Sequence, residues 1–188
     1  MRKSSISKFS DEEIVAAVIA GDSELYVNLV QRYQKALFRY ALSLVSDHDV
    51  AQDIVQDAFI KAYVNLRGFN QKKKFSSWIY RITHNRAMDF FRSQKKLLSF
   101  EAIPELVSTF RSSSDVEAEF EASLTQKNID SVIYSLPAQY RGVVTLYFIE
   151  NKKYGEISEI LGVPEGTVAT WLRRSKQLLA KALQDHKP

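Results

Sequence analysis

Residues 154–168 read YGEISEILGVPEGTV, in which two helical segments are separated by a short turn. Gly162 can adopt the left-handed conformation that ends many helices, and Pro164 suits the start of the next helix because it cannot extend the one before it. A turn this short makes the two helices cross steeply and exposes the second of them. The stretch therefore predicts a helix-turn-helix motif.

The second helix of this motif, predicted over residues 165–183, has side chains suited to reading duplex DNA. Its basic residues Arg173, Arg174 and Lys176 can contact phosphates. Near its start, the side chains able to reach base edges in the major groove are Glu165, Thr167 and Thr170. The alternative is a purely structural helical hairpin, which would not account for the basic second helix.

Helical periodicity extends from this motif in both directions, and the 188 residues include only 6 glycines and 4 prolines. We therefore predict an all-α protein of two small helical domains. Ser10 and Glu13 have the spacing of a capping box before the first apolar run. Helices are expected over about 25–44, 50–66 and 76–93 in the first domain, and over about 138–150, 154–161 and 165–183 in the second.

The stretch between the two domains differs in composition. Residues 97–123 are acidic and serine-rich, and they contain Pro104 and the run Ser112-Ser113-Ser114. These features are typical of a flexible linker. We expect a first domain over residues 1–96, a linker over 97–123, and a second domain with the helix-turn-helix over 124–188.

Composition excludes several classes of protein and site. The chain has no run of about 18 apolar residues that could cross a membrane, and its basic start lacks the apolar segment of a secretory signal. The absence of cysteine removes disulfides and thiolate sites, and the 3 histidines are scattered. We expect a cytoplasmic protein that does not insert into membranes and has no metal site, no cofactor and no catalytic residue.

Charge is strongly segregated along the chain, whose net charge is only +4. Residues 11–57 carry 3 basic against 9 acidic side chains, whereas residues 58–96 carry 10 basic against 1 acidic. The linker is acidic, and the last segment is again basic. Two basic segments separated by an acidic one indicate two contacts with a polyanion, namely nucleic acid.

Four side chains of the helix predicted over residues 50–66 share one face. Asp53, Gln56, Asp57 and Ile60 stand at i, i+3, i+4 and i+7, away from the apolar side of that helix. Two acids, an amide and an isoleucine suit a protein contact with a polar rim and Ile60 as its apolar anchor. The alternative is a solvated acidic face.

Residues 72–92 interleave aromatic and basic side chains. Unpaired bases stack on such rings with about 1–3 kcal/mol per base, while Lys and Arg hold the phosphates. Most of the rings are expected in the core, so Asn85 and the loop over residues 68–74 are the better candidates for base contact. The rings are Phe75, Trp78, Tyr80, Phe90 and Phe91.

These features together resemble bacterial sigma factors of the extracytoplasmic-function (ECF) group, a two-domain branch of the sigma-70 family. The likeness covers about residues 11–183 and includes the segment DIVQD at 53–57 and the segment FSSWIYRITHN at 75–85. In the second domain it includes Leu136-Pro137 and Gly166-Thr167-Val168. Together, in this order and at these spacings, the motifs are far more specific than any one of them alone.

The resemblance implies a factor that directs core RNA polymerase to promoters, in a stress or envelope response. The face of Asp53, Gln56, Asp57 and Ile60 would dock on the clamp helices of the β′ subunit, and the linker would pass through the enzyme, whose β subunit is also a partner. The first domain would open the −10 element and hold it as a single strand, and the second would read the −35 duplex. An anti-sigma factor is the further partner that the resemblance implies.

The contact residues follow from the same likeness. At the −10 element the expected contacts are Phe69, Lys72, Lys73, Lys74, Phe75, Trp78, Arg81, Asn85, Arg86 and Arg92. At the −35 element they are Glu165, Thr167, Thr170, Trp171, Arg173, Arg174 and Lys176. Ala169 and Trp171 stand where the family often has basic residues, which leaves the −35 sequence open.

Two other functions are weighed against this one. A free-standing helix-turn-helix regulator would bind duplex DNA without polymerase, but it leaves the acidic face and the aromatic-basic stretch unexplained. An enzyme acting on nucleic acid is disfavoured because the chain has neither G-x-x-x-x-G-K nor G-x-G-x-x-G, and because Asp89 is the only acid of residues 58–96.

Overall fold

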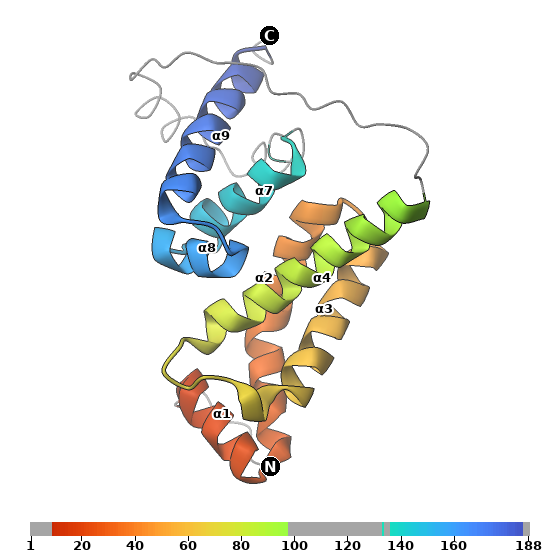
Figure 1. Cartoon of the computed structure of the whole chain (residues 1–188), viewed down its shortest axis with the longest axis vertical. Coiled ribbons are helices and arrows are strands. Elements are labelled where there is room, and N and C mark those ends of the chain that lie inside the picture. Colours follow the sequence, from red (N-terminus) through yellow and green to blue (C-terminus); the bar gives the residue numbers. More distant parts are fainter. Residues whose placement is uncertain (1–8, 98–132, 134–135, 186–188) are drawn as a thin grey trace.

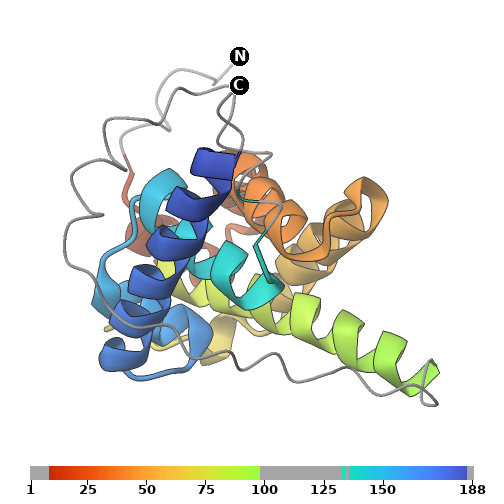
Figure 2. The ribbon, with the colours of Figure 1, turned by 90° about the horizontal axis from the view of Figure 1, so that it is seen from above.

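The computed structural model describes residues 9–97, 133 and 136–185, and every regular element in these ranges is a helix or a helical turn (Figure 1, Figure 2). This confirms the all-α prediction, while the predicted linker lies outside the described residues except for Leu97. The elements are α1 (Asp11–Ala20), η2 (Ser23–Leu25), α2 (Tyr26–Val45), α3 (His48–Val64), η3 (Leu66–Gly68), α4 (Phe75–Leu97), α7 (Ala138–Val144), η4 (Thr145–Ile149), α8 (Tyr154–Leu161) and α9 (Glu165–Asp185).

Helices α2, α3 and α4 pack against one another and form the body of the first domain. On α4, Phe75, Ile79, Thr83 and Ala87 follow at intervals of four and are all fully buried. The hydroxyl of Thr83 donates to the carbonyl of Ile79 at 3.0 Å, which satisfies the one polar group of this row. The buried row fixes which sides of α4 face α2, α3 and solvent.

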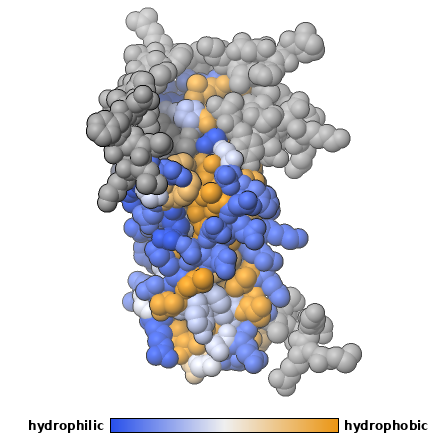
Figure 3. All heavy atoms as spheres, turned by 90° about the vertical axis from the view of Figure 1, so that its right-hand side faces the viewer, coloured by the Kyte–Doolittle hydropathy of each residue, from blue (hydrophilic) through white to orange (hydrophobic). Residues whose placement is uncertain are grey.

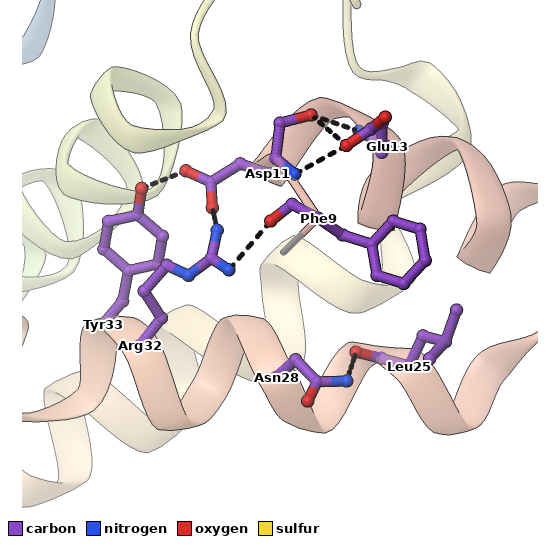
Figure 4. Close-up of polar contacts among 8 residues, drawn as sticks. Phe9, Asp11, Glu13, Leu25, Asn28, Arg32 and Tyr33 are labelled. Carbon is purple, nitrogen blue, oxygen red and sulfur yellow. Dashed lines mark hydrogen bonds and ion pairs between the residues drawn. The ribbon is translucent and has the colours of Figure 1, made fainter. Parts of the chain in front are cut away.

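Helix α1 is attached to α2 by polar contacts at its first turn (Figure 4). The carboxylate of Asp11 accepts hydrogen bonds from both Arg32 and Tyr33 of α2. Arg32 also donates to the carbonyl of Phe9 at 3.0 Å. The predicted capping box is confirmed, because Ser10 and Glu13 bond reciprocally at the start of α1.

The second domain consists of α7, η4, α8 and α9. Gly162 ends α8 with a φ of +69°, as the sequence predicted, and α8 has the predicted bounds. The helix predicted over residues 138–150 differs, because α7 ends at Val144 and continues as η4, a π-helical turn. There the amide of Glu150 bonds to the carbonyl of Thr145 at 2.9 Å, which leaves the side chain of Glu150 at the end of the widened turn.

The two domains lie side by side, with α8 against α4 and α7 against α2, and both ribbon views show this arrangement (Figure 1, Figure 2). Their buried apolar side chains form one continuous cluster. Within the described ranges, no helix combines the length and the apolar character needed to cross a membrane.

A partly buried histidine links α4 to α2. Nδ1 of His84 lies 2.9 Å from the hydroxyl of Tyr40, a fully buried residue, and burial lowers the pKa of His84 to about 4. In the unfolded chain, histidine titrates near pH 6.5. Between these two values the unfolded state binds a proton that the folded state excludes, so stability falls as the pH falls from 6.5 towards 4.

We predict that His84→Asn makes the free energy of unfolding less sensitive to acid. Asparagine retains an acceptor for Tyr40 but does not titrate. Between pH 7 and pH 5 the variant should lose about 2 kcal/mol less than the wild type, as measured by urea unfolding. His48→Asn, at a histidine whose side chain is 70% exposed, is the control and should lose as much as the wild type. Equal pH dependence of all three proteins would contradict the assignment.

Candidate nucleic-acid interface and docking ridge

The four side chains predicted to share a face of α3 form a ridge between two grooves. Gln56 and Ile60 line a groove of about 620 Å³ between α2 and α3. Asp53 and Asp57 line another, of about 360 Å³, between α3 and α4. We call these four residues the docking ridge. It offers two carboxylates to the groove between α3 and α4, and the amide of Gln56 and the apolar side chain of Ile60 to the groove between α2 and α3.

The surface around the docking ridge is unusually apolar for an exposed face. Ile60 is 54% exposed, and Tyr63 and Val64, three and four residues further along α3, are also large exposed apolar residues. Figure 3 shows the side of the molecule to which α3 contributes, with orange patches among blue ones. Clustered exposed apolar side chains rimmed by polar groups are typical of protein-binding sites.

Asp57 of the docking ridge is paired with Arg86 of α4. Arg86 also lies 3.7 Å from Asp89, and Arg92 lies 2.9 Å from the same carboxylate. Sequence reasoning assigned Asp57 to a protein contact and Arg86 to a DNA contact. The structure brings these two residues together, so the two candidate surfaces adjoin at this ion pair.

A shallow depression of about 220 Å³ lies beside this ion pair, between the C-terminal end of α3 and the middle of α4. Trp78, Ile82 and Asn85 contribute from α4, where their spacing places them on one side of the helix. An indole, an aliphatic side chain and an amide offer both a stacking surface and hydrogen-bonding groups to a base. Arg86 adds a positive charge at the rim.

Two residues of the depression were missed by sequence reasoning. Lys61 in the last turn of α3 and Asn65 just after that helix line it, and the side-chain amide of Asn65 donates to the carbonyl of Lys61 at 2.8 Å. Their spacing of four residues near the helix end was the available signal. Nothing in the sequence indicated that α4 folds back beside that turn.

The loop between η3 and α4 exposes three lysines. Lys72, Lys73 and Lys74 are all exposed, but the last two are paired with acids of α8. The hydrogen bond from Lys74 to Glu156 raises the pKa of Lys74. In the part of the chain that the structure describes, Lys72 and Arg81 form no ion pair.

The predicted aromatic contacts divide into buried and accessible rings. Phe75 is fully buried and Phe69 is 7% exposed, so the prediction that they contact DNA directly does not fit this structure. Phe69, Phe75 and Trp78 form a ring cluster with centroids 4.8–6.0 Å apart. The two phenylalanines therefore support Trp78, which is only partly buried and is the ring placed at the depression.

The predicted recognition helix, α9, presents its predicted contacts at the surface of the second domain. Glu165, Arg173 and Arg174 are exposed, and the other predicted contacts are partly buried. The partly buried contacts are Thr167, Thr170, Trp171 and Lys176. Nζ of Lys176 lies 5.9 Å from the ring centroid of Phe148. The structure thus brings the −35 candidates together on one helix, separate from the −10 candidates on α4.

In residues 9–97, 133 and 136–185, no three side chains among His, Asp and Glu are grouped so that they could hold an ion.

Comparison with known proteins adds two family matches. The sigma-70 region 2 model matches residues 29–97, and the sigma-70 region 4 model matches residues 126–179. The chain is 32% identical to the ECF RNA polymerase sigma factor SigW of Bacillus subtilis, over 91% of this chain and 95% of that protein. It is 29% identical to the ECF RNA polymerase sigma-E factor of Haemophilus influenzae, over 94% and 97%.

Solved structures share the fold. CnrH in complex with the cytosolic domain of CnrY aligns with a TM-score of 0.69 at 23% identity, over 94% of this chain and 99% of that one. RpoE of Bartonella quintana, solved with the anti-sigma factor NepR, aligns with a TM-score of 0.66 at 22% identity, over 86% and 98%.

We predict that the pair of Asp57 and Arg86 couples α3 to α4 weakly but measurably. A double-mutant cycle of Asp57→Asn and Arg86→Gln should give about 0.2–1 kcal/mol of coupling in the free energy of unfolding, because the two side chains are 49% and 28% exposed. High salt should reduce the coupling. The same cycle with Asp53→Asn is the control and should give none. Equal coupling in both cycles would contradict a specific pair.

Proposed function

The chain belongs to the sigma-70 family, in its ECF group, and from this premise we propose how its surfaces divide the work of promoter recognition. It is an RNA polymerase sigma factor, which directs core enzyme to promoters and initiates transcription. We assign core docking and the −10 element to residues 1–96, and the −35 element to residues 124–188, with 97–123 as the linker. The assignment is carried by one observation: the ion pair between Asp57 and Arg86 joins the docking ridge on α3 to the rim of the depression between α3 and α4.

The docking ridge is the proposed contact with the clamp helices of the polymerase β′ subunit. Asp53 and Gln56 are exposed and offer polar groups to a partner, and Ile60 offers an apolar anchor that is 54% exposed. Asp57 is already paired with Arg86. A polymerase contact at Asp57 therefore either competes with this ion pair or adds to it.

The depression is the proposed site for an unstacked base of the −10 element. Trp78 and Asn85 supply stacking and hydrogen bonding, and extrusion of a base costs a few kcal/mol, which such contacts must offset. Positive side chains around it would hold the strand's phosphates, and those proposed are Lys72, Lys73, Lys74, Arg81, Arg86 and Arg92. Opening of the duplex would then be driven by binding energy for the single strand, with no bond chemistry by this chain.

Helix α9 is the proposed reader of the −35 duplex. Glu165, Thr167 and Thr170 at its start would approach base edges, and Arg173 and Arg174 one turn further would hold the backbone. Trp171 and Lys176 complete the proposed set. Each domain then makes only a modest DNA contact, and binding to one polymerase joins the two contacts by effective concentration.

An anti-sigma factor is the proposed regulatory partner. NepR is the anti-sigma factor bound to the Bartonella quintana protein of similar fold. The docking ridge and its two grooves would be the shared surface for which an anti-sigma factor and the polymerase compete.

We predict that Asp53→Lys weakens the complex with bacterial core RNA polymerase by about tenfold or more, because the reversal places a positive charge on the docking ridge. The complex is measured by size-exclusion chromatography and by fluorescence anisotropy at moderate salt. Asp49→Lys, one turn earlier on α3 with a side chain 99% exposed, is the matched control. The docking assignment fails if Asp49→Lys impairs the complex as much as Asp53→Lys does. If the wild type binds duplex DNA tightly but forms no complex, the free-standing regulator is favoured instead.

We also predict that the two DNA contacts of the free protein can be separated by salt titration. Arg173→Gln/Arg174→Gln should lower the log–log salt slope for duplex DNA by about 0.9 for each lost phosphate contact. Lys72→Gln should lower the slope for an oligothymidylate by about 0.7. Each variant is the control for the other, since each should leave the other probe's slope unchanged. Equal effects of both variants on both probes would refute the division between the domains.

A further inference from the structure

The two domains are held together by a polar contact at the end of η4, which centres on one buried carboxylate. The carboxylate of Glu150, whose side chain is 6% exposed, accepts from Arg39 of α2 at 2.9 and 3.1 Å and from the hydroxyl of Tyr80 of α4 at 2.7 Å. Nζ of Lys152 lies 4.7 Å from the ring centroid of Tyr80, and partial burial lowers the pKa of Lys152. We call these four residues the Glu150 latch.

Beside the Glu150 latch, α8 presents two acids to the loop lysines. Nζ of Lys74 lies 2.9 Å from Glu156, and Nζ of Lys73 lies 3.3 Å from Glu159. Glu156 also caps α8 by accepting from the amide of Lys153 at 2.9 Å, and together these bonds hold the pKa of Glu156 below its usual value although partial burial opposes them. Glu156 is therefore an ionised carboxylate facing the lysine at neutral pH.

The apolar side of the contact is closely fitted. Gly142 of α7 meets α2 so closely that a Cβ at this position would lie 2.9 Å from Cδ2 of Leu44, which is almost fully buried. The neighbouring Arg141 donates to the carbonyl of Leu44 at 2.9 Å. Polar and apolar contacts thus cooperate to hold α7 and α8 against α2 and α4.

These contacts place carboxylates where the phosphates of a single strand would have to bind. We propose that this closed arrangement is an autoinhibited state of the free protein, in which α8 masks the loop lysines from single-stranded DNA. The proposal rests on the assignment of Lys73 and Lys74 to the −10 contact. A strand that binds these lysines must displace Glu156 and Glu159, so DNA and α8 compete for the same charges.

Two variants open the closed state by different means. Glu156→Gln/Glu159→Gln removes the two carboxylates, and glutamine at position 156 can still cap α8. Gly142→Val places a side chain against Leu44 and leaves every charge unchanged. The control is Asp22→Asn/Glu24→Gln, which removes two exposed acids whose side chains make no ion pair within the described residues.

Full-length proteins are compared by small-angle X-ray scattering and by fluorescence anisotropy with a labelled oligothymidylate at low salt. Both opened variants should increase the radius of gyration by about a fifth, as expected when two packed domains separate. Both should bind the oligothymidylate about threefold tighter or more, because the apparent Kd falls as the competent fraction rises. The control should match the wild type in both measurements.

Unchanged dimensions of both opened variants would overturn the closed state, and larger dimensions without tighter binding would overturn the masking. Adding Lys73→Gln/Lys74→Gln to Gly142→Val separates this inference from the function proposed above. If the added changes weaken binding, the −10 assignment stands even where autoinhibition fails. If they do not, the loop does not hold the strand and both proposals fail.

Discussion

Burial of one row of side chains on α4 determines where the candidate contacts of that helix lie. Phe75, Ile79, Thr83 and Ala87 are spaced by four residues and fully buried, so α4 cannot rotate about its axis without exposing them. With this row inward, the sides of the helix that face α3, the depression and α8 are all set at once. The same packing constraint therefore places three sets of side chains of α4. Arg86 lies toward α3, Trp78 and Asn85 lie at the depression, and Tyr80 lies toward the second domain.

Charge compensation is the second constraint, and it changes how the basic stretch is understood. The excess of basic residues over 58–96 suggests an open polyanion site, yet Lys73, Lys74, Arg86 and Arg92 all have acidic partners in the folded chain. Exposed pairs of this kind are individually weak and are screened by salt. Binding of nucleic acid therefore replaces these ion pairs with contacts to phosphates. The net gain in binding free energy is smaller than the number of basic residues implies.

Features set by neighbouring residues were predictable from the sequence, and features set by distant ones were not. The capping box at Ser10, the left-handed Gly162 and the bounds of α8 depend on contacts within one or two turns, and all three were confirmed. The π-helical turn η4 was missed because periodicity does not distinguish one widened turn in an apolar run. The pairing of Arg39 with Glu150 was not predictable because it joins residues 111 positions apart in the chain. The burial of Phe75 was not predictable because it depends on the packing of three helices.

The covalent connection between the domains explains how such weak contacts can matter. Two domains on one chain meet at an effective concentration that free domains would not reach, so ion pairs too weak to hold separate proteins can hold a closed state. Under the function proposed above, the same connection favours simultaneous binding of the −10 and −35 elements by the two domains. Core docking, promoter contact and closure of the two domains therefore all gain affinity from this effective concentration. Docking and promoter contact must each be strong enough to replace the closed state. This makes the balance sensitive to single charges on α8, because the pairs of Glu156 with Lys74 and of Glu159 with Lys73 join the two domains.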